Sequence, residues 1–170
     1  FAFLFRQMLI DNSKSTSDNQ TCATAEPFCT TDVVNFHVEA NTGSCESGPD
    51  YDCMSSYTQR PPHWFYMKIA VAGTFTIQIT NSNNNDLDFC AWGPFTDPVQ
   101  PCTSQLTSDK VIDCDSPYNS VQECTIPASS QVGDYYLMVI TKWSSGPTDV
   151  SFSKKPGSGP GETDCGILPG

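Results

Sequence analysis

Nine cysteines spread over 170 residues constrain the fold of this chain more than any other feature of its sequence. Their spacings are long, no C-x-x-C pair occurs, and the chain has only two histidines, so a zinc or iron–sulfur site is disfavoured. Long spacings in a chain rich in Thr, Asn and Pro favour disulfide bonds and therefore an oxidising compartment: the periplasm, the cell surface or the outside of the cell. The disulfide candidates are Cys22, Cys29, Cys45, Cys53, Cys90, Cys102, Cys114, Cys124 and Cys165.

Two local disulfides are predicted from the spacing. Cys90 and Cys102 flank the loop AWGPFTDPVQP, and Cys114 and Cys124 flank DSPYNSVQE. Each bond would close a loop of about ten residues and add roughly 2–3 kcal/mol to the stability in the chain-entropy model. The connectivity of the other five cysteines stays open. Because nine is an odd number, one thiol is either free or paired with another chain.

The charge balance excludes one class of partner. Eight Lys and Arg against 19 Asp and Glu give a net charge of −11, so the chain lacks the cations that a nucleic-acid binder needs to neutralise phosphates. Anionic membrane surfaces are disfavoured for the same reason. No stretch of about 18 apolar residues is present, so we expect no membrane span.

Short runs of β-branched and aromatic residues predict an all-β fold. The clearest are residues 33–39, 63–71, 74–80, 86–92 and 134–142, and weaker ones are 110–113, 121–126 and 149–153. Residues 63–71 and 74–80, joined by Ala72-Gly73, predict a β-hairpin. In its second arm Phe75, Ile77 and Ile79 alternate with polar residues and should face the core. We expect an antiparallel, jelly-roll-like β-sandwich stapled by disulfides.

Three regions differ in composition. Residues 1–21 combine the apolar segment FAFLFRQMLI with a polar tether, residues 22–155 hold the sandwich, and residues 156–170 form a Gly/Pro-rich tail. Three interpretations of the first segment stay open: a strand donated to a neighbouring molecule, a first strand paired within its own sandwich, or the core of a signal peptide. Since the chain starts at Phe1 rather than Met, we expect a mature or trimmed product.

A set of motifs in fixed order resembles a known module. The segments are CATAEPFCT (22–30), SGPDYDC (47–53), PPHWFYMKIAVAGTFTIQIT (61–80), DLDFCAWGPF (86–95), VIDCDS (111–116), IPASSQVGDYYLMVIT (126–141) and TDC (163–165). Together they resemble a β-sandwich module of large secreted or cell-surface proteins of Bacteroidota, which also carry PKD-like repeats and regions associated with gliding or type IX secretion. More distantly, the chain is similar to the pre-peptidase C-terminal domain.

The resemblance covers residues 22–165 and implies a fold and a location rather than an activity. Two features depart from the module. Cys45 is additional, which would account for the odd count, and the apolar segment before Cys22 does not belong to the module.

No catalytic motif is present, and we expect no enzyme activity. The sequence lacks G-x-S-x-G, H-E-x-x-H, a P-loop and a dinucleotide fingerprint. His37 and His63 fall in or beside predicted strands, where histidine is usually structural.

Two sets of residues are candidates for ligand binding. Asp86 and Asp88, two apart on a predicted strand after an Asn run, are candidate Ca²⁺ ligands, although they form only part of a ligand set. The alternative is that Asn83–Asn85 form a turn and the aspartates cap backbone amides. Trp92 and Trp143 are candidates for an exposed platform that binds a ligand. No other cofactor is expected.

Two functions follow from these patterns. The first is a non-catalytic structural or adhesive surface protein, in its strongest form a filament subunit. In that form Phe1, Phe3, Phe5 and Leu9 would insert as a donor strand into the next subunit and produce a head-to-tail polymer. The second is a glycan- or protein-binding module of a larger secreted protein, which would bind a ligand of a host or cell surface.

Overall fold

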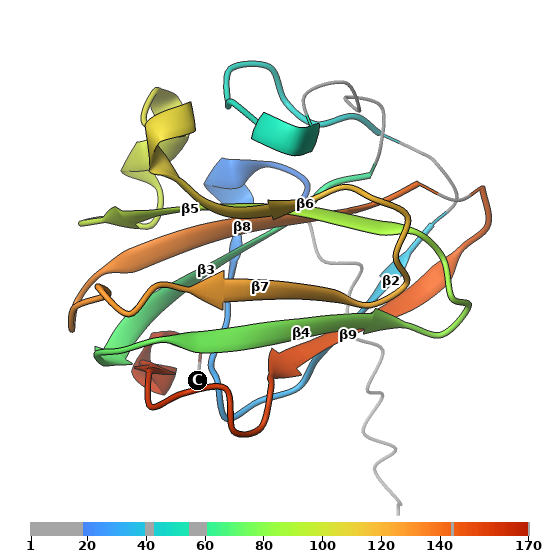
Figure 1. Ribbon diagram of the computed structural model, residues 1–170. Helices are drawn as coiled ribbons and strands as arrows, with labels where there is room; N and C mark the ends of the chain where they lie inside the picture. The colour runs from blue at the N-terminus through green and yellow to red at the C-terminus, as the bar shows by residue number, and fades with distance from the viewer. Residues whose placement is uncertain (1–18, 40–42, 55–60, 144, 170) are drawn as a thin grey trace, which may run out of the picture.

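The computed structural model describes residues 19–39, 43–54, 61–143 and 145–169. Within these residues the chain forms two facing sheets, and the predicted all-β sandwich is confirmed (Figure 1). The segment 1–10, predicted as a donor strand, lies outside the described residues. No helix in the described part of the chain is long and apolar enough to cross a membrane.

The larger sheet has the order β1-β3-β8-β5-β6, with β10 also paired to β3. Its pairs are antiparallel except β1–β3. The strands are β1 (Glu26–Pro27), β3 (His63–Val71), β5 (Leu87–Phe95), β6 (Val111–Asp115), β8 (Tyr135–Lys142) and β10 (Glu162–Thr163).

The smaller sheet is antiparallel and has the order β2-β9-β4-β7. Its strands are β2 (Val34–Val38), β4 (Phe75–Asn81), β7 (Gln122–Ile126) and β9 (Thr148–Lys154). Because β2-β9-β4-β7 faces β3-β8-β5-β6, strands β2 to β9 have the order of a jelly roll. In the described part of the chain, short 3₁₀ helices lie in the connections: η1 (Cys22–Thr24), η2 (Asp52–Met54), η3 (Gln100–Thr103), η4 (Ser108–Lys110) and η5 (Cys165–Ile167).

An inner core fills the space between the sheets. Strand β4 alternates as predicted, with Phe75, Ile77 and Ile79 fully buried and the residues between them half-buried. They belong to one apolar cluster with Phe89 of β5 and with alternate residues of β8. The predicted core partners are all present: Phe89, Tyr136, Met138 and Ile140.

The predicted hairpin of residues 63–80 is wrong, because β3 and β4 lie in different sheets. The connection at Gly73 (φ +121°) crosses from one sheet to the other, and the Ser130 hydroxyl bonds to its backbone N–H and C=O. Each arm instead pairs with strands far along the chain, β3 with β8 and β4 with β7 and β9. The period-two pattern is the same for both arrangements, so it does not distinguish them.

A second apolar cluster covers the outer face of the six-stranded sheet. Trp64 and Trp92 stack with ring centroids 5.5 Å apart, and Tyr51 packs against both. Residues 43–54 and 96–110 lie above this face, on the side away from the smaller sheet (Figure 1). We call this cluster and its covering segments the outer layer.

Three disulfides join segments distant in the sequence: Cys22–Cys102, Cys29–Cys165 and Cys53–Cys114. Such bonds are typical of an extracellular or cell-envelope location. Cys45, Cys90 and Cys124 are buried and stand outside these bridges.

The predicted pairs Cys90–Cys102 and Cys114–Cys124 are therefore wrong. Cys114 lies on the outer face of its sheet, whereas Cys124 points into the inner core, so a sheet separates them. Cys90 lies in the middle of β5, directly opposite Cys114, while Cys102 reaches Cys22 instead. Closeness in the sequence does not place two cysteines on one face.

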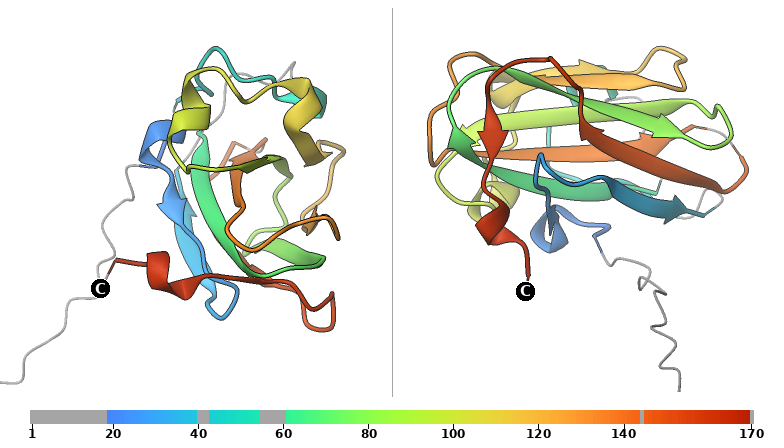
Figure 2. Two further views of the ribbon diagram at one scale, coloured as in Figure 1. Left: turned by 90° about the vertical axis from the view of Figure 1, so that its left-hand side faces the viewer. Right: turned by 90° about the horizontal axis from the view of Figure 1, so that it is seen from below.

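The C-terminal residues lie along the sandwich, beside the N-terminal part of the described chain (Figure 2). Strand β10 pairs with the end of β3, and Cys165 is bonded to Cys29. Residues 156–169, expected as a tail, therefore pack against the domain.

Candidate ligand-binding pocket

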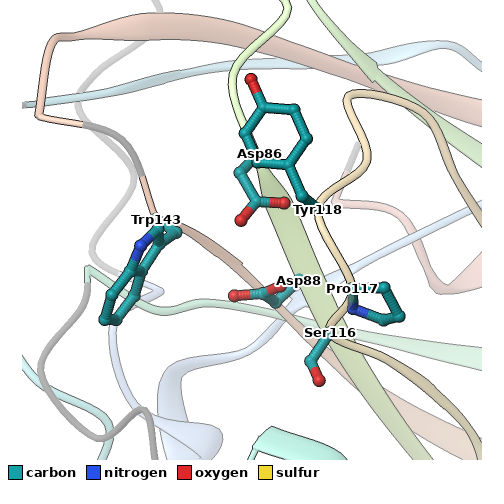
Figure 3. Close-up of a pocket in the computed structure, with 6 residues that line it drawn as sticks. All are labelled: Asp86, Asp88, Ser116, Pro117, Tyr118 and Trp143. Carbon is teal, nitrogen blue, oxygen red and sulfur yellow. The ribbon is translucent and has the colours of Figure 1, made fainter.

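A pocket of about 360 Å³ opens at one end of the outer face of the six-stranded sheet. Aspartate side chains point into it from β5 and the residue before, between Trp143 on one side and the loop after β6 on the other (Figure 3). The lining residues are Asp86, Asp88, Ser116, Pro117, Tyr118 and Trp143.

The turn before Asp86 is held by the side chain of Asn81. Its Oδ1 accepts from the backbone N–H groups of Asn83 (3.1 Å) and Asn85 (2.8 Å), and its Nδ2 donates to the carbonyls of Asn85 (2.9 Å) and Ser120 (3.1 Å). Asparagine forms such turns because its short amide reaches the backbone two residues on. The Asn-rich turn expected from the sequence is confirmed, and it fixes where β5 begins.

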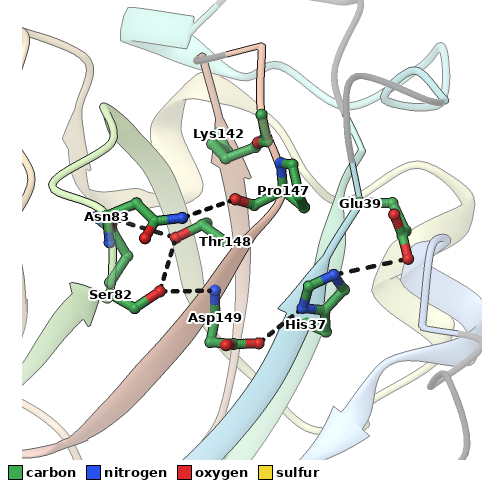
Figure 4. Close-up of polar contacts among 10 residues, drawn as sticks. His37, Glu39, Ser82, Asn83, Lys142, Pro147, Thr148 and Asp149 are labelled. Atoms are coloured by element: carbon green, nitrogen blue, oxygen red, sulfur yellow. Dashed lines mark hydrogen bonds and ion pairs between the residues drawn. The ribbon is translucent and has the colours of Figure 1, made fainter.

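A second set of bonds ties this turn to the smaller sheet (Figure 4). Nδ2 of Asn83 donates to the Pro147 carbonyl (2.9 Å), and the backbone N–H of Asp149 donates to the Ser82 hydroxyl (3.3 Å). The Asp149 carboxylate contacts Nδ1 of His37 on β2 (2.7 Å). The turn thus has little freedom to shift relative to β9 and β2.

His37 lies at an exposed position of β2. Its ring lies between two carboxylates, with Asp149 on Nδ1 and Glu39 on Nε2 (3.6 Å).

Asp86 fastens the loop after β6. The Oδ1 of Asp86 accepts a hydrogen bond from the backbone N–H of Asn119 (3.0 Å), and the carbonyl of Asn119 accepts one from the N–H of Leu87 (3.0 Å). The backbone carbonyl of Asp86 accepts a hydrogen bond from the N–H of Trp143 (2.9 Å). Asp86 thus caps a backbone amide, as one of the two alternatives from the sequence expects, but this amide belongs to the loop after β6 and not to the strand entry. These bonds set the distance between the two walls of the pocket.

Asp88 lies deeper, with a side chain that is almost completely buried. Thr141 is opposite it on β8, and the Thr141 hydroxyl has no hydrogen-bond partner within the described residues. On the other wall the Ser116 hydroxyl donates to the carbonyl of Cys53 (3.2 Å), whose side chain is bonded to Cys114. A disulfide therefore holds this wall two residues from the pocket.

Negative charge concentrates in this region. The pKa of Asp115 is raised, first by burial and then by the charges of Asp113 and Asp86. Lys142 belongs to the opposite face of its strand, because it pairs with the core residue Leu87, and its Nζ donates to the Gly146 carbonyl. Its pKa is lowered by burial. The nearest lysine along β8 thus faces away from the pocket.

The aromatic walls are exposed. The exposed fraction is 53% for Trp143 and 75% for Tyr118, so both rings have area left for a ligand. Trp92, predicted as part of the platform, is fully buried under Trp64, and its Nε1 donates to the Asp50 carbonyl (3.0 Å). That prediction is wrong, because loops cover the face on which Trp92 lies.

Sequence reasoning identified Asp86, Asp88 and Trp143 but missed Ser116 and Tyr118. The available signal was a tyrosine between Pro and Asn in a turn sequence, where no strand would bury it.

The residues predicted to bind Ca²⁺ form only part of the ligand set that this ion needs. Asp86 and Asp88 do face one pocket, but no cluster of three or more His, Cys, Asp or Glu suited to a metal ion occurs in the part of the chain that is described. Ca²⁺ takes six to eight oxygen ligands. Two carboxylates fall well short of that number.

No family model matches this chain, and no curated protein sequence matches it. Among solved structures it is similar to the pre-peptidase C-terminal domain of a collagenase from Bacillus anthracis, with 13% identity and a TM-score of 0.43 over 77% of this chain and 94% of that one. It is also similar to a periplasmic inhibitor of g-type lysozyme from Aeromonas hydrophila (13%, TM-score 0.39, 77% and 96%).

A third similarity is to carbohydrate-binding modules of the β-sandwich superfamily, with 10% identity and a TM-score of 0.33 over 85% of this chain and 62% of that one. At these identities and scores the comparisons carry no information on function. The Bacteroidota module stays a prediction.

Proposed function

We propose that this chain is a non-catalytic binding module of the cell envelope or the extracellular space, and that it binds a saccharide in the pocket of Figure 3. The observation that carries the proposal is the pair of buried carboxylates, Asp86 and Asp88, between the exposed rings of Trp143 and Tyr118.

The chemistry of the walls fits a sugar ring. A pyranose has apolar C–H faces, which pack against aromatic rings, and hydroxyl groups at its edge, which donate to carboxylates. The volume of about 360 Å³ is near the lower end of the range for small-molecule sites, so the pocket suits one or two sugar units.

The pocket is also pre-organised. The bonds of Asn119 to Asp86 and Leu87 hold one wall, and the backbone bond from Trp143 to Asp86 holds the other. A site whose walls are fixed before binding loses less conformational entropy when the ligand enters. This supports recognition of a ligand as the task of the pocket.

Binding fits the geometry better than catalysis. In glycoside hydrolysis two carboxyl groups flank the scissile bond. Asp86 and Asp88 are two residues apart on one chain segment and enter the pocket from the same side, and Asp86 is engaged by the Asn119 amide. Burial raises the pKa of the Cys90 and Cys124 thiols, which makes them poor nucleophiles.

A glycan array followed by calorimetry on the full chain tests the proposal. Trp143→Ala should weaken the best saccharide about fivefold or more, since a lost aromatic contact costs about 1 kcal/mol. The matched control is Val132→Ala, another exposed apolar residue outside the pocket. Chelation of calcium with EDTA should leave the affinity unchanged. Binding that both variants retain in full would place the site elsewhere and contradict the proposal.

The filament hypothesis stays a second proposal. The feature that favours it is that β2, among the strands of the described residues, lies at the edge of the smaller sheet. An edge strand can accept an added strand through its main chain. Deletion of residues 1–10 should convert fibres of the intact chain into monomers in negative-stain images. Fibres that persist after deletion, or an intact chain that is monomeric at high concentration, would exclude it.

A further inference from the structure

Two separate pieces of chain cover the edge of β3 that faces away from β8. Strand β1 pairs with the first part of this edge and β10 with the last part. Between them, the backbone N–H of Phe28 donates to the Tyr66 carbonyl (2.8 Å). The backbone N–H of Asp164 donates to the next carbonyl on this edge, that of Lys68 (2.7 Å). The residue after each donor is a cysteine, and these two cysteines form the bridge Cys29–Cys165, which therefore joins the two pieces where they meet.

The two pieces are held by different forces. Phe28 is fully buried in the inner core, with its ring centroid 4.9 Å from that of Phe152. None of the described residues after Gly161 belongs to either apolar cluster. They are held by polar contacts, such as the bond from the Thr30 backbone N–H to the Thr163 hydroxyl (2.7 Å). Opening of the bridge would therefore loosen residues 162–169 and leave β1 in place.

The two sulfur atoms of the bridge differ in access. Cys29 is 1% exposed, whereas Cys165 lies at an exposed position. The Thr31 hydroxyl is 3.1 Å from Sγ of Cys29 and 3.3 Å from Sγ of Cys165. Neither sulfur carries a proton in the bridge, so the hydroxyl is the donor, and a thiolate at either sulfur would accept from it more strongly. Of the three bridges in the described residues, this one alone has no cysteine in an apolar cluster.

We propose that Cys29–Cys165 is a site of thiol–disulfide exchange with a dithiol reductant, and that its opening releases residues 162–169 from β3. Release uncovers the Lys68 carbonyl, and an uncovered strand edge can pair with a strand of another chain. The inference does not depend on the saccharide pocket.

The exchange proceeds in two steps. A thiolate of the reductant attacks the exposed Sγ of Cys165, the S–S bond breaks, and its electron pair leaves with Sγ of Cys29, to which the Thr31 hydroxyl donates. The second thiolate of the reductant then attacks the mixed disulfide and displaces Cys165. The reductant leaves as a disulfide, two electrons pass to the bridge, and the two protons of the dithiol end on the two cysteines.

Stepwise reduction of the native full chain with dithiothreitol, followed by alkylation and peptide mapping, tests the order of opening. Cys29 and Cys165 should be alkylated at a dithiothreitol concentration about tenfold or more below the one that opens Cys22–Cys102 or Cys53–Cys114. If the three bridges open together, or if Cys29–Cys165 opens last, the proposal is wrong.

Variants of Thr31 test the chemistry of the step. Thr31→Val should slow the opening of this bridge about fivefold or more, because it removes a hydrogen bond to the leaving thiolate. Thr31→Ser keeps the hydroxyl and should restore the rate. The matched control is Thr125→Val, at an exposed threonine of β7, and it should leave the rate unchanged. Equal rates in Thr31→Val and Thr125→Val would contradict the role given to Thr31.

Hydrogen exchange measures the release. After selective reduction the backbone N–H of Asp164 should lose its protection, whereas that of Phe28, on the same edge of β3, should keep it. If both amides stay protected, the bridge does not hold the segment, and if both lose protection, the fold opens as a whole. Either result would overturn the proposal.

Two double variants repeat this comparison without a reductant. Cys29→Ser combined with Cys165→Ser should expose the Asp164 amide to exchange. Cys53→Ser combined with Cys114→Ser removes a bridge of the outer layer instead and should leave that amide protected. The same exchange rate of the Asp164 amide in the two proteins would contradict the proposal.

Discussion

The inner core and the outer layer lie on opposite faces of the same six-stranded sheet, yet they are held by different forces. The inner core consists of alternate strand residues from both sheets, such as Ile77 and Phe89, which bury apolar surface against each other. The outer layer covers the sheet with short 3₁₀ helices and loops, and two disulfides, Cys22–Cys102 and Cys53–Cys114, fasten those loops.

The difference shows how a loop-built layer becomes rigid enough to carry a site. Strand ladders satisfy backbone groups and fix the inner residues, whereas the covering loops have few such ladders. In the loops the disulfide bonds take over the role of the strand ladders, because they restrict the unfolded ensemble. The pocket lies at the end of the outer layer, so its walls depend on the second mechanism.

The largest effect should come from breaking the inner core. Ile77→Asp should prevent folding, because a carboxylate would be buried without a partner at a fully buried position. The control Thr76→Asp changes the neighbouring residue, whose hydroxyl bonds to Thr125 on the exposed side of the sheet. Circular dichroism with thermal melts compares the two, and a normally folded Ile77→Asp protein would show that the register of β4 is wrong.

Removal of a bridge should loosen the outer layer without unfolding the inner core. Cys53→Ser combined with Cys114→Ser should lower the free energy of unfolding by roughly 4 kcal/mol, as expected for a bond that spans 61 residues. Denaturant titration measures this loss. Cys124→Ser, outside the bridges and facing the inner core, separates loss of the bond from loss of a thiol. An equal loss of unfolding free energy in the double variant and in Cys124→Ser would contradict the claim that the disulfide stabilises the outer layer.

Acid should destabilise the inner core through His63. Burial lowers its pKa to about 4, and Nδ1 contacts the side-chain oxygen of Asn19 (3.1 Å). An unfolded histidine has a pKa of about 6.5, so between these values the unfolded state binds more protons. This contribution is constant above about pH 6.5 and declines by roughly 3 kcal/mol in total as the pH falls to about 4.

Two variants isolate that effect. His63→Gln should flatten the pH dependence of the unfolding free energy between about pH 4 and 6.5, whereas the same change at the half-exposed His37 should preserve it. A profile that keeps its slope in the His63 variant would assign the acid sensitivity to other groups.

The smallest of these effects should come from the turn that positions the pocket. Asn81→Ala removes a side chain that forms hydrogen bonds with the backbone of Asn83, Asn85 and Ser120. The free energy of unfolding should therefore fall by about 2 kcal/mol. Saccharide affinity should fall as well, since the start of β5 would be free to shift. The control Asn83→Ala loses one side-chain bond, to Pro147, and should cost about 1 kcal/mol. An unchanged affinity in Asn81→Ala would show that the turn does not support the site.

The sequence predicts the strand patterns of the inner core better than the long-range contacts of the outer layer. Strand β3 occupies the expected residues 63–71, and the inner face of β4 is the expected one, because period-two patterns report burial directly. Strand partners and disulfide partners were missed, because both depend on which face of which sheet a residue occupies. Trp92 illustrates this point, since its face is covered by loops whose path no local pattern encodes.

The candidate site was predicted in part for a similar reason. Asp86 and Asp88 share a face by strand alternation, and Trp143 follows a strand end, so both features are local. Ser116 and Tyr118 belong to a loop that reaches the pocket through the bond between Asn119 and Asp86 and through the Cys53–Cys114 bridge. Such long-range contacts appear only in the folded chain.

The indole N–H resonances of the three tryptophans offer the most direct test of the central claim, that the pocket binds a saccharide. Trp64 and Trp92 are fully buried in the outer layer, whereas Trp143 is half-exposed in the pocket wall. Titration of the best saccharide from the glycan array should shift the Trp143 resonance, assigned by its loss in Trp143→Phe, and leave the other two in place. Saturable binding with an unmoved Trp143 resonance would contradict the account.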